Sequence, residues 1–136
     1  MDLLKSIAVA ASGLRSQSGR MRVIAENLAN ADSGPDRAGA EPYRRKIPTF
    51  QRHVDRELEA QVVSLGRVQR DQSAFRAKYD PGNPVADAAG NVRMPNVNSL
   101  VEATDMREAQ RSYEANLNVI SSSRRMLQRT IDILRA

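Results

Sequence analysis

Residues 3–29 read LLKSIAVAASGLRSQSGRMRVIAENLA, and this stretch decides the fold. Its apolar and small residues recur at alternating spacings of three and four, the heptad pattern of a helix that packs against other helices. Two overlapping stripes share half of their members, so the apolar face is wide enough for more than one partner. Gly13 and Gly19 each cost about 1 kcal/mol relative to Ala in a free helix. We therefore expect a helix of roughly 40 Å that is marginal when alone.

A second long helix is expected from Ser99 to about Leu134. Ser99 and Glu102 fit a capping box, in which the hydroxyl and the carboxylate bind backbone N–H groups at the helix start. The apolar seam that follows consists of Met106, Tyr113, Ile120, Leu127 and Leu134, seven apart, with Leu117 and Ile131 between them. Polar residues such as Asn116 and Ser123 interrupt this seam, which fixes helix register at some cost in stability.

The segment between the helices has a different character. Residues 30–42 are rich in turn formers and lack periodicity, which predicts an exposed loop. Residues 43–50 and 68–79 favour extended structure, with Pro48 indicating an edge, whereas residues 53–64 fit helix and strand equally well. Turns are expected at 80–84 and 89–91, followed by an extended lead-in to the second helix at 92–98.

These patterns predict a mainly α fold. Long N- and C-terminal helices pack as a coiled-coil-like hairpin, and a small irregular β-containing segment lies between them. The expected division is an N-terminal core helix in 1–30, a loop and small middle domain in 31–98, and a C-terminal core helix in 99–136. Each helix offers more apolar surface than one partner covers.

Composition limits the classes of function. The chain has 136 residues, of which 40% are hydrophobic and 4% aromatic, with no Trp and no Cys. The absence of Cys excludes disulfides, thiolate metal sites and Cys nucleophiles. The net charge of +5 comes mainly from Arg residues interleaved with acids, which favours a solvated mixed-charge surface over a nucleic-acid-binding stripe. The short apolar run at 7–11 is interrupted, so we expect neither a cleaved signal peptide nor a membrane span.

No motif for catalysis or ligand binding is evident. The close carboxylate pairs lack an acid–base partner, and the single His, His53, cannot form a metal site alone. No Gly-rich run fits a phosphate loop, and Ser121, Ser122 and Ser123 are expected on a polar helix face. We predict no catalytic, cofactor-binding or metal-binding residue and no cofactor.

The helices are then the main functional feature. Periodicity alone fits an ordinary hairpin core and an intermolecular packing surface about equally, and the wide N-terminal stripe of small residues favours the second. The predicted subunit-packing residues are Leu4, Ile7, Ala11, Leu14, Met21, Leu28, Met106, Tyr113, Leu117, Ile120, Leu127, Ile131 and Leu134.

Several motifs resemble those of the flagellar rod and hook axial proteins. Residues 10–14 (AASGL) with 24–30 (IAENLAN) resemble the N-terminal signature of this family. Residues 42–46, 79–84, 94–98 and 109–117 are similar to its proximal-rod members, in the same order and over nearly the whole chain. The family-motif residues are Asn27, Leu28, Ala29, Asn30, Tyr79, Asp80, Pro81, Gly82, Pro95, Asn96, Val97 and Asn98. The sequence departs from the family pattern at Glu26, Asn83, Asn91-Val92 and the loop after Asn30, so contacts of that loop are not carried over.

The resemblance implies a structural subunit of the proximal rod that assembles helically, transmits torque and forms part of the export conduit. The implied partners are other copies, the related rod proteins FlgB, FlgF, FlgG and FliE, and the flagellar type III export apparatus during secretion. It implies no nucleic-acid partner and no membrane span. The implied location is the rod within the periplasm, reached from the cytoplasm without a cleaved signal peptide.

Three alternatives stay open at this point. The chain could be a different axial paralogue, which its position in a basal body would reveal. It could be a helical nucleic-acid-binding protein, which salt-dependent DNA binding would support. A small enzyme is the third, and it would require a pocket with perturbed titratable residues.

Overall fold

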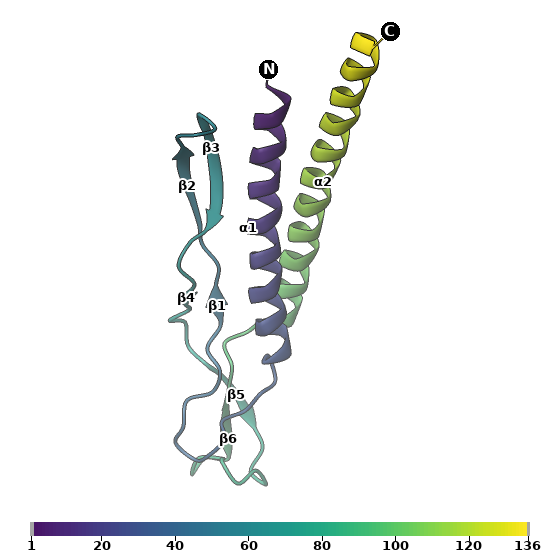
Figure 1. The fold of residues 1–136 in the computed structure, drawn as a ribbon. Coiled ribbons are helices and arrows are strands. Elements are labelled where there is room, and N and C mark those ends of the chain that lie inside the picture. Colours follow the sequence, from purple (N-terminus) through teal and green to yellow (C-terminus); the bar gives the residue numbers. More distant parts are fainter. Residues whose placement is uncertain (1, 136) are drawn as a thin grey trace. The chain divides into compact units, whose positions relative to one another are not determined.

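The computed structural model describes residues 2–135 and contains two long helices joined by short strands (Figure 1). The helices are α1 (Leu3–Ala29) and α2 (Ser99–Arg135). The strands are antiparallel pairs: β1 (Lys46–Ile47) with β4 (Gln69–Arg70), β2 (Phe50–Asp55) with β3 (Ala60–Leu65), and β5 (Arg76–Tyr79) with β6 (Asn91–Met94). The expected fold class, two long terminal helices with a small strand-containing middle region, is confirmed.

The chain divides into two compact units, and both helices contribute to each. Unit 1 comprises Met1–Met21, Pro48–Arg67 and Arg107–Ala136, and unit 2 comprises Arg22–Ile47 and Val68–Met106. The division into two core helices and a middle domain at 31–98 concerns the role of each part in an assembly, and it stays a prediction.

In unit 1 the two helices run antiparallel and approach closely. A Cβ atom added to Gly13 would lie 2.9 Å from the side-chain amide of Asn116. Two turns further along α1, the guanidinium of Arg20 donates to the carboxylate of Glu108 at 3.3 Å. Small side chains are buried along this contact, including Ala10, Ala109 and Ser123. Gly13 therefore serves close helix packing, which compensates for its low helix propensity.

The ambiguous stretch 53–64 belongs to a β-hairpin in unit 1. Strands β2 and β3 pair in a regular register from Phe50 opposite Leu65 to Asp55 opposite Ala60. The connecting turn is tight, and Glu59 adopts a left-handed backbone conformation with φ of 48°. The hairpin packs on α1, where a Cβ atom added to Gly19 would lie 2.9 Å from the side chain of Leu65.

Unit 2 has a small apolar core and long loops. Its buried apolar residues are Val23, Ile24, Ala31, Val92, Met94 and Val97. The predicted loop after Asn30 is confirmed, and Arg76 supports its start by donating to the carbonyl of Ala31 at 2.9 Å. The predicted turns are also confirmed: the Asn83 N–H donates to the Asp80 carbonyl, and Gly90 has a φ of 80°. A positive φ is readily adopted by Gly, which explains its place in this turn.

Three local predictions are wrong. The start of α2 is not a capping box, because the Asn98 side chain accepts hydrogen bonds from the N–H groups of Leu100 (3.0 Å) and Val101 (3.3 Å). The Glu102 carboxylate instead accepts hydrogen bonds from the side chains of Asn27 and Arg45. Ser123 does not lie on a solvated face, since it is 3% exposed. The single strand expected at 43–50 is instead two: β1 covers Lys46–Ile47, the ladder stops at Pro48, which has no N–H to donate, and β2 begins at Phe50.

Candidate assembly surface

Two faces of α1 are covered within unit 1. Every seventh residue from Lys5 contacts the β2–β3 hairpin: Lys5 pairs with Glu59 at 3.6 Å, Ser12 binds Val63, and Gly19 adjoins Leu65. The residue that follows each of these lies on the side of α2: Ser6 shares a hollow with Ser122 and Met126, Gly13 adjoins Asn116, and Arg20 binds Glu108.

A third face of α1 carries three of the predicted packing residues, whereas Ala11 lines the hollow under the hairpin. Ile7, Leu14 and Met21 each follow the α2-facing residue by one position. Because an α-helix turns by about 100° per residue, they point away from both the hairpin and α2. All three side chains stay only half-buried. The periodicity of residues 3–29 is therefore explained in part by an apolar face that the described chain covers incompletely.

None of the predicted packing residues is fully buried within the described chain. Those that are half-buried are Ile7, Ala11, Leu14, Met21, Leu28, Met106, Tyr113, Ile120 and Leu127. Those that are exposed are Leu4 (63%), Leu117 (46%), Ile131 (39%) and Leu134 (81%). Exposed apolar surface of this extent on two helices is typical of a site for protein–protein contact.

The α1-facing line of α2 differs from its predicted seam. Ala109, Asn116 and Ser123 recur every seventh residue, and Ala109 and Ser123 are buried. The predicted seam of Met106, Tyr113, Ile120 and Leu127 lies about 40° further round the helix, where its side chains are only partly covered. Sequence reasoning missed this row of residues facing α1 because Ala109, Asn116 and Ser123 are small or polar.

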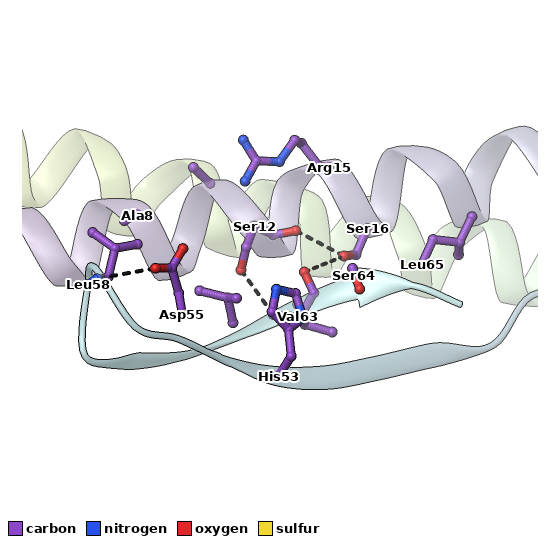
Figure 2. Close-up of a pocket in the computed structure, with 12 residues that line it drawn as sticks. Ala8, Ser12, Arg15, Ser16, His53, Asp55, Leu58, Val63, Ser64 and Leu65 are labelled. Carbon is purple, nitrogen blue, oxygen red and sulfur yellow. Dashed lines mark hydrogen bonds between the residues drawn. The ribbon is translucent and has the colours of Figure 1, made fainter. Parts of the chain in front are cut away.

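A hollow of about 450 Å³ lies between α1 and the hairpin in unit 1 (Figure 2). Its polar lining includes Arg15, His53 and Asp55. Within residues 2–135 no hydrogen bond joins these three side chains to one another, and the Asp55 carboxylate instead accepts from the N–H of Leu58 in the hairpin turn. The hollow is thus part of the contact between the hairpin and α1. Its polar side chains are not arranged as an acid–base pair.

Unit 2 contains a cluster of bonded polar groups that links three motifs. Asn27 is 0% exposed and donates to the carbonyl of Lys46 (2.8 Å) and to the carboxylate of Glu102 (3.0 Å). The side-chain carbonyl of Asn27 accepts from the N–H of Lys46 (2.9 Å) and the hydroxyl of Tyr43 (2.9 Å). The guanidinium of Arg45 binds Glu102, which is 1% exposed. This cluster satisfies buried polar atoms that would otherwise be costly.

Charge and burial in this cluster perturb its tyrosine. Burial, with a further contribution from the carboxylates of Glu26 and Glu102, raises the pKa of Tyr43 to about 12. The pKa of Asp71 is lowered, chiefly because its carboxylate accepts a hydrogen bond from the backbone N–H of Ser73. The folded chain therefore favours the neutral phenol of Tyr43, which donates to Asn27, and the charged carboxylate of Asp71, which accepts from Ser73.

The remaining family-motif residues are structural parts of unit 2. Asn30 donates to the carbonyl of Glu26 at the end of α1, beside the half-buried Leu28 and exposed Ala29. Tyr79 is 72% exposed and leads into the turn formed by Asp80, Pro81 and Gly82.

The motif before α2 is more deeply placed. Pro95 and Val97 are buried, and Asn98 caps α2. The side chain of Asn96 accepts from the N–H of Arg45 (2.7 Å) and donates to the carbonyl of Asp71 (3.1 Å). These residues therefore hold loops together, and none of them forms a reaction centre.

Two further features of residues 2–135 bear on other classes of site. No group of three or more His, Cys, Asp or Glu side chains is placed to hold a metal ion. Neither described helix combines the length and the apolar character needed to cross a bilayer.

Comparison with known proteins identifies the family of this chain. The family described as "Flagella basal body rod protein" matches residues 7–35, and the family described as "Flagellar basal body rod FlgEFG protein C-terminal" matches residues 88–133. A relative from Agrobacterium fabrum, named flagellar basal-body rod protein FlgC, is 49% identical over 100% of this chain and 99% of its own length. Relatives of the same name from Escherichia coli O6:H1 and Aquifex aeolicus are 40% and 37% identical, over 98% and 97% of each chain.

Antiparallel terminal helices, with rod-protein matches at both ends of the chain, define a flagellar rod protein. Within that class, the chain belongs to the family of the flagellar basal-body rod protein FlgC. It is a structural subunit of the flagellar basal-body rod and not an enzyme. The alternatives of a small enzyme and of a different axial paralogue are therefore wrong.

Proposed function

We propose that this subunit forms part of the proximal rod and assembles helically with copies of itself and with FlgB, FlgF, FlgG and FliE. The observation that carries the proposal is the partly exposed apolar face of Ile7, Leu14 and Met21 on α1, which faces neither α2 nor the hairpin. An open tube requires contacts between unlike surfaces of successive subunits. A helix with one face packed inside the subunit and another partly exposed offers such surfaces.

The two long helices would form the axial core, and residues 31–98 would form the middle domain. Many parallel packed helices, each anchored over several turns, give the stiffness that torque transmission requires. A tube of such subunits also encloses a channel, which suits a role as part of the export conduit. The subunit would reach the periplasm through the type III export apparatus, without cleavage of a signal peptide.

A charge placed on this partly exposed face tests the proposal. We expect Leu14→Asp to reduce the number of complete rods by about tenfold or more, because full burial of a Leu side chain contributes about 1.5–3 kcal/mol and an unpaired carboxylate adds a desolvation cost. The measurement is the amount of this subunit in purified basal bodies, together with motility. Leu127→Asp on α2 should have the same effect.

Two matched variants separate assembly from folding. Leu14→Met keeps an apolar side chain of similar volume and should assemble normally. Gln110→Asp adds a carboxylate at an exposed position of α2 and should also assemble. A motile Leu14→Asp strain with normal rod numbers would contradict the proposal.

A further inference from the structure

The two edges of the β2–β3 hairpin differ within unit 1. The hydroxyl oxygen of Ser12 accepts from the N–H of Val63 (3.3 Å), and the hydroxyl of Ser16 donates to the carbonyl of Val63 (3.1 Å), as Figure 2 shows. Both backbone groups of Val63 therefore point away from β2, toward α1. Two serine side chains of α1 cap the outer edge of β3, and Figure 1 draws β3 between β2 and α1.

The register shows which groups form the opposite edge. Val63 lies opposite Arg52, so this is a non-hydrogen-bonded pair, and the backbone groups of Arg52 also point outward. The pairing alternates along an antiparallel ladder, which places the N–H and C=O groups of Phe50 and Val54 on the same outer edge. The hydrogen bond from the Gly66 N–H to the Thr49 carbonyl fits this alternation.

The side chains at this edge have a distinct pattern. Phe50 is 42% exposed and Val54 is 61% exposed, and Arg52 between them is also exposed. Alternate residues of a strand share one face, so these three form an apolar–cationic–apolar row beside the free edge. Because two-stranded hairpins are marginal in water, a third strand would add main-chain hydrogen bonds and apolar cover.

The row also indicates which strand fits. If β2 of a second copy paired antiparallel with Phe50 opposite Val54, the two Arg52 residues would stand directly opposite each other. Like charges in that position are destabilising, and a central cation on an edge strand is a common protection against self-pairing. A strand with an acidic residue opposite Arg52 and apolar residues two positions away on either side has the complementary pattern.

We propose that the outer edge of β2 is a docking site for an extended segment of another protein, with the pattern apolar–x–acidic–x–apolar. The segment adds a third strand to the hairpin through the backbone groups of Phe50, Arg52 and Val54. Its acidic side chain pairs with Arg52, and its apolar side chains cover Phe50 and Val54. Main-chain hydrogen bonds supply affinity in this mode of recognition, and alternate side chains supply specificity. The inference does not depend on where in the rod the subunit sits.

The test uses the full chain and a short synthetic peptide, acetyl-Thr-Val-Thr-Glu-Thr-Val-Thr-amide, observed by amide hydrogen exchange and NMR titration. On binding, the amides of Arg52 and Val54 should become protected, while those of Gln51 and His53, already paired with β3, should change little. The matched peptide with Lys in place of Glu should bind about tenfold more weakly. A peptide methylated on the nitrogen atoms that face β2 should not bind.

A charge reversal completes the test. Arg52→Glu should reverse the preference between the two peptides, and Arg52→Gln should abolish it. Equal affinity for both peptides, protection away from β2, or no binding at millimolar peptide would overturn the proposal. Protection of the same amides at high protein concentration without peptide would overturn it too, because the occupant would then be a second copy of the chain.

Discussion

Tyr43 joins the loop before β1 to α1 through its hydrogen bond to Asn27, and its pKa is raised to about 12. The unfolded chain releases this proton near the ordinary value of 10.0. Stability from the neutral phenol is therefore fully present below pH 10 and is lost as the pH rises toward 12. We expect the urea midpoint of unfolding to fall across this window.

Tyr43→Phe should remove much of this alkaline fall. At pH 8 the variant should also be less stable by about 1 kcal/mol, because the hydrogen bond to Asn27 is lost. The measurement is urea unfolding at pH 8, 10 and 11, with Tyr79→Phe as the control, since Tyr79 is 72% exposed. An alkaline fall in Tyr43→Phe as large as in the unchanged chain would contradict this assignment.

Glu102 shows where residue-level prediction fails. Its position three residues after Ser99 fits a capping box, but the carboxylate is used by Arg45 and Asn27, and Asn98 caps the helix. Two capping schemes one residue apart are nearly equivalent in sequence, and the choice depends on a cation 57 residues away in the chain. The resemblance did identify Asn27 and Asn96 as motif residues, but it did not indicate what they bind.

At the scale of elements, helical periodicity predicted α1 and α2 almost to the residue, whereas the β2–β3 hairpin was ambiguous. Every residue of β2 from Phe50 to Val54 is exposed, so the strand lacks the apolar–polar alternation of a half-buried strand. Its partner β3 is held by serines of α1 that lie 47 and 51 residues away. Such a contact leaves no local signal in the sequence.

The serine contacts give a prediction for this element. Ser12→Ala leaves the Val63 N–H without its acceptor, and we expect a loss of about 1 kcal/mol, somewhat offset by the higher helix propensity of Ala. Amide exchange at Val63 should become faster. Ser18→Ala, at an exposed position of the same helix, should leave exchange in the hairpin unchanged. Unaltered exchange at Val63 in Ser12→Ala would contradict the edge-capping role.

At the scale of the whole molecule, the sequence could not distinguish the helix faces that pack within the chain from the face that stays partly exposed. The heptad pattern in α1 combines three faces, and only contacts with the hairpin and α2 separate them. The faces in contact carry small residues such as Ala10, Ser12 and Gly13, and the partly exposed face carries Ile7, Leu14 and Met21. Apolar periodicity therefore missed the small and polar residues of the internal contacts, and the surface that it assigns to neighbours stays a prediction.

The most direct measurement is cryo-electron microscopy of the isolated basal body with side chains resolved. The account predicts that Ile7, Leu14 and Met21 of each copy lie within about 4.5 Å of apolar side chains from neighbouring rod subunits. It would be contradicted if this face of α1 were open to solvent or to the channel in the assembled rod, or were covered by its own chain.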